Sequence, residues 1–450
     1  MSYGGASLPS LEALAGWMPR QRWFAAKTRR ISRAVVGEAV RLGPGVVLLV
    51  EVELDGGRRE RYAIPLLAGD EIHDALGDAE FCRVLLGLLA RGGAVPGERG
   101  EMRGVPAAGL PESWGGGVPA ELSVRRLGGE QSNSSVALGE ALVLKHFRKL
   151  AEGVNPEAEM TRFLTEHTSF RHTPRLAGHV EYRDEAGRTT TLAVAQELVA
   201  DAHDGWQWVL EQLGEPARVA AAAVALRRLG QRTGELHRAL ASDRGDPAFA
   251  PEPIAVADIA AWTEGVAAQL VAARAALGRE AISVDLAVVR RGLAPMIGRQ
   301  KIRHHGDFHL GQTLYRPAAG DWMIIDFEGE PLRPLEERRR KHVALRDVAG
   351  LLRSIDYAAA SVPGAGASLR AWEAEAGGAY LEGYRATTGT ALFLPESDEA
   401  VRDVVAVFEL EKAAYEVVYE ANNRPDWIGI PKRGLVNAAS RLGRRAAGAA

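Results

Sequence analysis

The sequence contains almost no cysteine. Cys82 is the one cysteine among 450 residues, which excludes an internal disulfide and a zinc site made of clustered cysteines. We therefore expect Cys82 to be a small buried hydrophobic side chain. The histidines also lack the spacing of a metal motif such as HExxH, so the sequence gives little support to a histidine metal centre.

Long apolar runs and an excess of one charge are also missing. The longest apolar runs, such as GVVLLVEVEL at 45–54, have the length of a strand and are too short to cross a bilayer. The first residues, MSYGGASLPSLEALAGW, lack the basic start and the apolar centre of a secretory signal, so we expect a cytoplasmic protein. The formal net charge is -3, so no overall basic field favours nucleic acid or an anionic membrane surface.

The hydrophobic pattern changes along the chain. Residues 34–65 alternate between apolar and polar in three runs with glycine-rich turns between them, which predicts a small antiparallel unit. A helix is expected at 79–93, and the Gly- and Pro-rich residues 94–120 favour turns and a linker that could include one strand. A second strand-rich unit with one helix follows. From about 204 the apolar residues recur every three or four positions, as they do in helices.

This pattern predicts three parts. We expect an N-terminal β-rich cap domain at 1–105, a β-rich lobe at 106–200 and a mostly helical lobe at 201–450. The chain shows no internal repeat of the period expected for a solenoid.

The segments RHHGDFHLGQTLY at 303–315 and MIIDFEGEP at 323–331 carry the strongest chemical signal. A loop aspartate, an amide five positions later and a second aspartate after a short hairpin are typical of kinases. Asp307 would accept the proton of the substrate hydroxyl, while Gln312 and Asp326 would bind Mg²⁺. Kinases usually have Asn where this chain has Gln312, but both amides offer the oxygen ligand that Mg²⁺ prefers.

Two plainer interpretations of these segments stay open. Asp307 could be a turn or cap residue. His304, His305 and His309 could bind a metal, although no further ligand stands at a suitable spacing.

A kinase also needs residues that hold the nucleotide, and candidates precede Asp307. Lys145 lies in the strand pattern ALVLKHF, and Glu159 lies near the start of the next helix, so the two could pair and orient Lys145 onto the α- and β-phosphates. The polar turn GGEQSNSSV offers hydroxyl, amide and backbone N–H groups to the phosphates of ATP, although it could be a simple hairpin turn. The residues of this turn are Gln131, Ser132, Asn133, Ser134 and Ser135. The hinge whose backbone would meet adenine is expected at Gln196, Glu197 and Leu198.

Together these motifs resemble the bacterial maltokinases. The matching segments are WMPRQRWFAAK, EQSNSSV, LKHFRKL, GVNPE, DGWQW, HGDFHLGQTLY, IDFEGEPLRPLEERR, LRDVAGLLRSIDYAA and YEANNRPDW. The resemblance runs through nearly the whole chain. It implies an α+β, two-lobed protein-kinase-like fold, related to aminoglycoside phosphotransferases, with an N-terminal β-rich cap domain. It also implies that ATP and Mg²⁺ are used to make maltose 1-phosphate for α-glucan synthesis from trehalose, with a possible association with trehalose synthase.

The sugar contacts are the least specific part of this prediction. Glu409, Lys412, Glu416 and Glu420 share a face of the expected helix, with Arg424 and Trp427 just beyond it. Carboxylates and an aromatic face suit a sugar, so we predict contacts from Glu328, Glu416, Arg424 and Trp427. The same face could equally be a solvated, salt-bridged one.

Three alternative functions are weighed against a maltokinase. A glucosamine kinase would have a DFDGNP-like segment where this chain has DFEGEP, and would lack NRPDW. An antibiotic or choline phosphotransferase fits the long cap and the EGEP segment poorly. A pseudokinase that binds nucleotide without turnover conflicts with the presence of Lys145, Asp307, Gln312 and Asp326.

Overall fold

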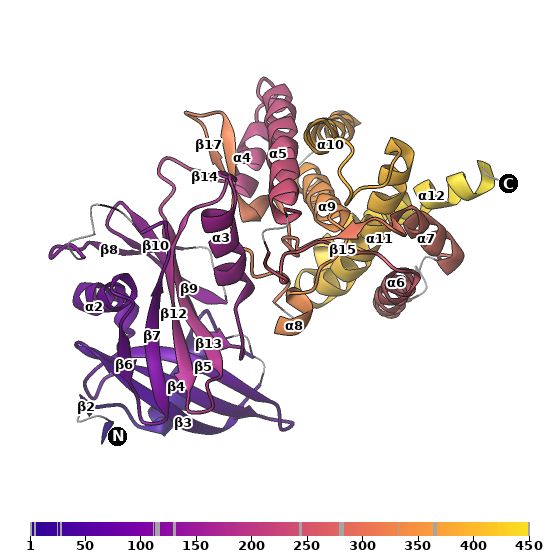
Figure 1. Ribbon diagram of the computed structural model, residues 1–450. Coiled ribbons are helices and arrows are strands. Elements are labelled where there is room, and N and C mark those ends of the chain that lie inside the picture. The colour runs from indigo at the N-terminus through magenta and orange to yellow at the C-terminus, as the bar shows by residue number, and fades with distance from the viewer. Residues whose placement is uncertain are drawn as a thin grey trace. The chain divides into compact units, whose positions relative to one another are not determined.

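The computed structural model describes most of the chain in two compact units, Met1–Ala200 and Asp201–Ala450 (Figure 1). The residues outside this description are 1, 4–5, 25, 28, 111, 113–117, 129–131, 243–244, 279–282, 332, 363–366 and 449–450. They include Gln131 of the predicted phosphate loop. The first unit is rich in strands and the second is mostly helical, in agreement with the α+β class predicted from the sequence.

Two antiparallel sheets make up most of the first unit. The four-stranded sheet has the order β11-β5-β4-β3 and the seven-stranded sheet has the order β6-β7-β12-β13-β10-β9-β8. The strands of the first sheet are β3 (Ile31–Leu42), β4 (Gly45–Leu54), β5 (Arg59–Leu67) and β11 (Lys149–Leu150). Those of the second are β6 (Ala94–Pro96), β7 (Gly100–Pro106), β8 (Val124–Arg126), β9 (Asn133–Leu138), β10 (Leu142–Phe147), β12 (Leu176–Asp184) and β13 (Thr189–Glu197).

The apolar run in β4 is explained by burial on both faces of its sheet. Val46, Leu48 and Val50 belong to one buried cluster, while Val47 and Leu49 belong to another. Since alternate residues of a strand point to opposite faces, an unbroken apolar run supplies both clusters. The remaining elements of the unit are β1 (Ser2–Tyr3), β2 (Ala6–Ser7), α1 (Leu11–Trp17), α2 (Ala79–Ala90) and α3 (Pro156–His167).

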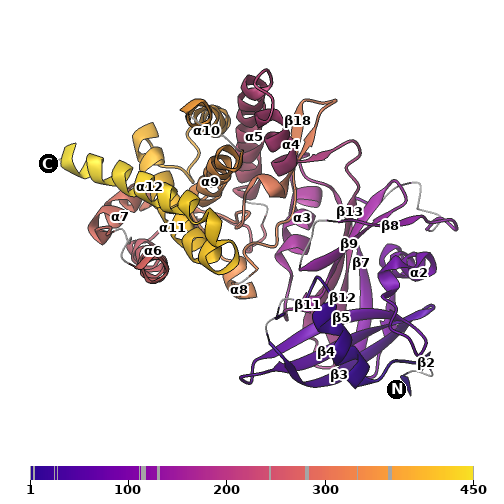
Figure 2. The ribbon, with the colours of Figure 1, turned by 180° about the vertical axis from the view of Figure 1, so that it is seen from behind.

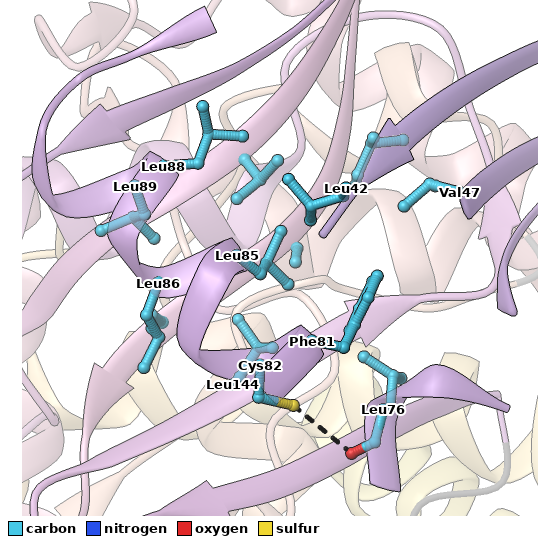
Figure 3. Packing of buried hydrophobic residues seen from close by; sticks show 14 of the residues in the cluster. Leu42, Val47, Leu76, Phe81, Cys82, Leu85, Leu86, Leu88, Leu89 and Leu144 are labelled. Carbon is cyan, nitrogen blue, oxygen red and sulfur yellow. Dashed lines mark hydrogen bonds between the residues drawn. The ribbon is translucent and has the colours of Figure 1, made fainter. Parts of the chain in front are cut away.

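Helix α2 joins the two sheets through a common core. Phe81, Cys82 and Leu85 of α2 pack with Val47 of the first sheet and Leu144 of the second (Figure 3). The prediction for the cysteine is confirmed, since Cys82 is buried and its thiol donates to the carbonyl of Leu76 at 3.5 Å. Strand β7, which the sequence-based division places in the cap, pairs with β12 and so belongs to the sheet that carries Lys145.

The second unit is built from long helices around a buried core. Figure 2 shows α11 running beside α9 and α12, and all three are in contact. Helices α5 and α10 cross closely because Gly230 and Gly383 stand where any added Cβ would overlap the backbone of the other helix. The helices are α4 (Gly205–Leu213), α5 (Val219–Leu240), α6 (Val256–Leu277), α7 (Leu286–Leu293), α8 (Leu335–Arg338), α9 (Leu345–Ser361), α10 (Ala367–Thr388), α11 (Asp398–Asn423) and α12 (Gly429–Gly448).

Two small sheets interrupt these helices. One contains β14 (His203–Asp204), β17 (Thr313–Arg316) and β18 (Asp321–Ile324), and the other pairs β15 (Glu252–Pro253) with β16 (Gln300–Lys301). Short 3-10 turns lie at Ala294–Met296, Leu310–Gln312 and Pro425–Trp427 in this unit, and at Met18–Arg20 and Ala75–Gly77 in the first unit. Among the helices that the structure describes, none has the length and apolar character to span a membrane.

Candidate active site

The segment that contains Asp307 is fixed by a buried carboxylate on α9. The backbone amides of His305 and Gly306 donate to Asp347 at 2.7 and 2.9 Å, and His237 Nε2 lies 3.1 Å from the same carboxylate. Gly306 has φ +87°, a conformation that favours glycine. Asp347 therefore holds the loop just before Asp307. Sequence reasoning assigned it no role, although it lies in the quoted motif LRDVAGLL.

A lysine lies directly beside the proposed catalytic base. Lys412 Nζ on α11 is 3.0 Å from Asp307 Oδ1 and 3.1 Å from Glu330 Oε1. Burial alone would lower the pKa of the Lys412 ammonium, but the two carboxylates outweigh it and raise this pKa. Lys412 therefore stays charged and holds Asp307 in one orientation. The sequence placed Lys412 on a face with Glu416 but did not identify Asp307 as its partner.

The two predicted magnesium ligands are brought together by the hairpin of β17 and β18. The amide of Ile325 donates to the carbonyl of Gln312 at 3.0 Å, which places Asp326 next to Gln312. Asp326 has φ +66°, an uncommon conformation for a residue with a side chain and one that recurs at functional sites. His305 Nε2 lies 2.9 Å from the carbonyl of Ile325 and so ties the Asp307 loop to this hairpin.

The oxygen donors at this hairpin suit a hard cation. Within the described ranges, no cluster of three or more His, Cys, Asp or Glu side chains could hold a metal. A carboxylate from Asp326 and an amide oxygen from Gln312 still fit Mg²⁺, since this ion usually takes one or two protein ligands and completes its shell with water and phosphate oxygens. His304 and His309 belong to no such cluster among the described residues.

In the first unit, Lys145 is buried on β10 between β9 and β13. Val143, two residues earlier, stands opposite Gln196 of β13, so Lys145 and Gln196 share one face of the sheet. Gln196 Nε2 donates to Glu157 Oε1 at 2.6 Å. Glu157, a buried residue of α3 that sequence reasoning passed over, is thus a carboxylate on the Lys145 face of the sheet.

The predicted partner Glu159 occupies a different side of α3. Two positions along an α-helix correspond to a rotation of about 200°, so Glu159 points away from the side on which Glu157 meets Gln196. Glu159 is half-buried rather than buried. The pairing of Lys145 with Glu159 stays a prediction, and helix geometry favours Glu157 for the role.

The predicted phosphate loop is supported by a buried arginine. Arg148 Nε donates to Ser134 Oγ at 2.8 Å, and the same guanidinium pairs with Asp74 and lies over the ring of Trp23 at 5.1 Å. Ser132 is exposed and Ser135 is buried. A cavity of about 360 Å³ is lined by both the loop and the segment Gln21–Trp23. Arg148 belongs to the quoted motif LKHFRKL, yet its role could not be seen from the sequence.

Two backbone amides of the predicted hinge donate hydrogen bonds to carbonyl groups of the first unit. The amide of Leu198 donates to the carbonyl of Ala141 at 2.8 Å, and that of Glu197 donates to the carbonyl of Arg175 at 2.9 Å. Neither of these two amides is therefore available to adenine.

The predicted sugar contacts are engaged in ion pairs and ring contacts. Glu416 pairs with Arg353 at 2.8 Å, Arg424 pairs with Glu420 at 2.7 Å, and Glu328 lies 4.0 Å from Arg338. The ring of Trp427 stacks on Tyr357, with 6.5 Å between centroids. A small cavity beside Asp307 is lined by a different set: Gln269, Gly306, Asp307, Phe308, Glu330, Arg333, Arg346, Asp347, Gly350, Phe408, Glu411, Lys412 and Tyr415.

Carboxylates and cations form ion pairs in this cavity, whose lining holds four carboxylates and three cations. Glu411 lies 3.2 Å from Arg346, and Glu330 pairs with Arg333 as well as with Lys412. Burial alone would raise the pKa of Glu330, but Lys412 and Arg346 hold this pKa at about 2. The side chains beside Asp307 therefore form an ion-paired lining with one carboxylate in excess, and Phe408 and Tyr415 are its aromatic part.

Comparison with known families agrees with this geometry. The model of the phosphotransferase enzyme family matches residues 123–391, more than half of the chain, and the model of the maltokinase N-terminal cap domain matches residues 17–91. The chain belongs to the phosphotransferase enzyme family. With the cap, the two matches support a sugar kinase and confirm the resemblance drawn from the motifs.

The curated relatives cover most of the chain. A glucosamine kinase of Streptacidiphilus jiangxiensis is 30% identical over 399 residues, which is 84% of this chain and 85% of that protein. A glucosamine kinase of Mycolicibacterium smegmatis is 30% identical over 326 residues, 68% of this chain and 77% of that protein.

Solved structures confirm the fold class of this phosphotransferase. A glucosamine kinase in one crystal form has a TM-score of 0.70 at 24% identity and covers 95% of this chain and 99% of its own. A glucosamine kinase in complex with glucosamine, ADP and inorganic phosphate has a TM-score of 0.68 at 23% identity, with the same coverage. The fold is thus the predicted kinase-like one, with a β-rich N-terminal lobe, a helical C-terminal lobe and an N-terminal cap.

Proposed function

We propose that this phosphotransferase is an ATP-dependent maltokinase, which transfers the γ-phosphate of ATP to the anomeric hydroxyl of maltose. The observation that carries the proposal is the Asp307 carboxylate, which is held by the loop contacts to Asp347 and by Lys412 at 3.0 Å. The match to a maltokinase cap and the motifs shared with maltokinases support maltose as the acceptor.

Each residue then has a defined part in the transfer. Asp307 accepts the proton of the anomeric hydroxyl while the hydroxyl oxygen attacks the γ-phosphorus of ATP, and ADP leaves. Gln312 and Asp326 would hold Mg²⁺, whose charge offsets that of the phosphates. Lys145, with an acidic partner on α3, orients the α- and β-phosphates, and the loop Ser132–Ser135 surrounds them.

The ion pairs beside Asp307 can bind the hydroxyl groups of a sugar. Three of the carboxylates there, Asp307, Glu330 and Glu411, each have a lysine or arginine within 3.2 Å. Sugar hydroxyls can hydrogen-bond to both members of such pairs.

Glucosamine is the second candidate acceptor, and the names of the two curated relatives favour it. Phosphate would then be expected on O6 rather than on the anomeric oxygen. A role in α-glucan synthesis, with trehalose synthase as a physical partner, belongs to the maltokinase proposal alone.

The deciding experiment compares maltose, glucose and glucosamine as acceptors at matched concentrations with ATP and Mg²⁺, and locates the phosphate by NMR. Maltose 1-phosphate as the preferred product supports the proposal. Glucosamine outpacing maltose, with phosphate on O6, assigns the chain to the second candidate. Binding of ATP without turnover of any sugar in the panel would indicate a pseudokinase.

A further inference from the structure

We propose that Tyr384 of α10 is a positioning residue for phosphoryl transfer, which acts on the Asp307 loop through the ring of His237 on α5. This inference rests on the proposed function, because it needs Asp307 as the base. The Tyr384 hydroxyl lies 3.0 Å from His237 Nδ1, and His237 Nε2 lies 3.1 Å from the carboxylate of Asp347, which holds the loop.

Close packing of α10 against α5 brings the tyrosine to this ring. A Cβ added to Gly383, the residue before Tyr384, would stand 2.0 Å from the carbonyl oxygen of Arg227 on α5. Glycine at this position therefore allows the two helices to approach until side chains of α10 contact side chains of α5. Figure 2 shows α10 next to both α5 and α9, and α10 is in contact with each of them.

The charges determine the direction of each hydrogen bond. Burial alone would raise the pKa of Asp347, but His304 and His237 lower this pKa. Asp347 is therefore an ionised carboxylate that only accepts, and the proton in its contact with His237 belongs to Nε2. Burial raises the pKa of Tyr384, so its hydroxyl keeps its proton and donates to Nδ1, the ring nitrogen without a proton.

These contacts form one chain of hydrogen bonds from α10 to the catalytic loop. Tyr384 donates to His237, and His237 donates to Asp347. Asp347 accepts in turn from the amides of the two loop residues before Asp307, at 2.7 and 2.9 Å. All three side chains are buried. Because buried hydrogen bonds polarise one another and are costly to leave unmade, we expect that removal of the first bond weakens the hold on the loop.

A second tyrosine of α10 provides the matched control. Tyr380, one helical turn earlier, is also fully buried, and its hydroxyl donates to a side chain of α5, Thr233 Oγ1, at 3.2 Å. Thr233 donates to the carbonyl of Leu229 at 2.9 Å within the same helix, so this second chain ends on α5. Tyr380→Phe therefore removes the same atom from a similar environment without changing the contacts of His237.

The kinetic test compares Tyr384→Phe with Tyr380→Phe, using ATP and the acceptor that the wild type phosphorylates fastest. We expect Tyr384→Phe to lower kcat about three- to tenfold, the size expected for one buried hydrogen bond, with little change in the KM for ATP. Tyr380→Phe should keep the wild-type kcat. In a His237→Gln background, whose amide can still donate to Asp347, Tyr384→Phe should lower kcat no further, because the path through the ring is already gone.

A spectroscopic measurement tests the hydrogen-bond directions in the wild type. Nitrogen NMR of isotope-labelled histidines shows which ring nitrogen carries a proton, and the His237 signals are identified by their loss in His237→Gln. We expect a protonated Nε2 and a bare Nδ1. The Nδ1 signal should shift in Tyr384→Phe and stay in place in Tyr380→Phe.

The outcomes separate this inference from the proposed function. A lower kcat in Tyr384→Phe alone, with no further loss in the His237→Gln background and a bare Nδ1, supports the inference. A wild-type kcat in Tyr384→Phe, an equal loss in Tyr380→Phe, a further loss in the His237→Gln background or a protonated Nδ1 overturns the inference and leaves the proposed function standing. A wild-type chain that phosphorylates no sugar overturns the proposed function, and this inference with it.

Discussion

The Lys412 ammonium places a positive charge next to the group expected to take up the substrate proton. In Lys412→Met we expect kcat to fall about 10²–10³-fold, because Asp307 loses its orienting partner and the transferring phosphoryl group loses a nearby positive charge. Lys412→Arg should recover part of the rate. Steady-state kinetics and ATP titration would measure this, with Arg402→Met, an exposed position on the same helix, as the control. A Lys412→Met enzyme with wild-type kcat would exclude Lys412 from the reaction.

Two isosteric substitutions on α3 can determine which glutamate pairs with Lys145. Glu157→Gln should raise the KM for ATP about tenfold or more, because Glu157 lies on the Lys145 face of the sheet. Glu159→Gln, on another side of the helix, should have a much smaller effect and is the matched control. Nucleotide titrations of both variants give the answer, and a larger loss in Glu159→Gln would restore the pairing first predicted from the sequence.

At the scale of single elements, a glycine on α9 sets how closely the catalytic loop approaches the helix. A Cβ added to Gly350 would stand 2.7 Å from the carbonyl oxygen of Phe308, the residue after Asp307. Gly350→Ala should therefore displace the loop and reduce kcat about tenfold or more, at a cost of about 1–3 kcal/mol in unfolding free energy. Gly378→Ala on α10 meets no atom within 4 Å and should instead stabilise its helix by about 1 kcal/mol. Rates and urea unfolding of the two variants check this, and unchanged kcat in Gly350→Ala would contradict it.

The elements also show how far local sequence patterns can be followed. The spacing on α11 correctly put Glu409, Lys412, Glu416 and Glu420 in one helix, because helical periodicity is a local property. Which of them reaches Asp307 depends on how α11 packs against residues more than a hundred positions away. The ion pairs of Glu416 and Glu420 were foreseen as one alternative, and the contact from Lys412 could be found only in three dimensions.

At the scale of the whole molecule, the change from strands to helices near residue 200 was readable from periodicity, and it coincides with the division into two units. The place of β7 was not readable. Its Gly and Pro residues favour turns, yet Gly104 pairs with Val180, and a Cβ at Gly104 would overlap the backbone of α2. Gly104 therefore allows close packing rather than a turn. The pairing of β7 with β12 joins segments far apart in the sequence, so no local sequence pattern predicts it.

Burial of His304 also makes the stability of the whole chain sensitive to acid. Burial lowers the pKa of this ring from 6.5 to about 4 in the folded protein, so below pH 6.5 the unfolded chain binds a proton that the folded chain does not. The associated stability is complete above pH 6.5 and is lost as the pH falls towards 4, by up to about 3 kcal/mol. Unfolding free energy measured by urea titration between pH 7 and pH 4 should therefore fall less steeply in His304→Gln than in the wild type. His203→Gln, which changes an exposed histidine of the same unit, should keep the wild-type slope. Equal slopes for all three chains would show that protonation of His304 does not contribute to acid unfolding.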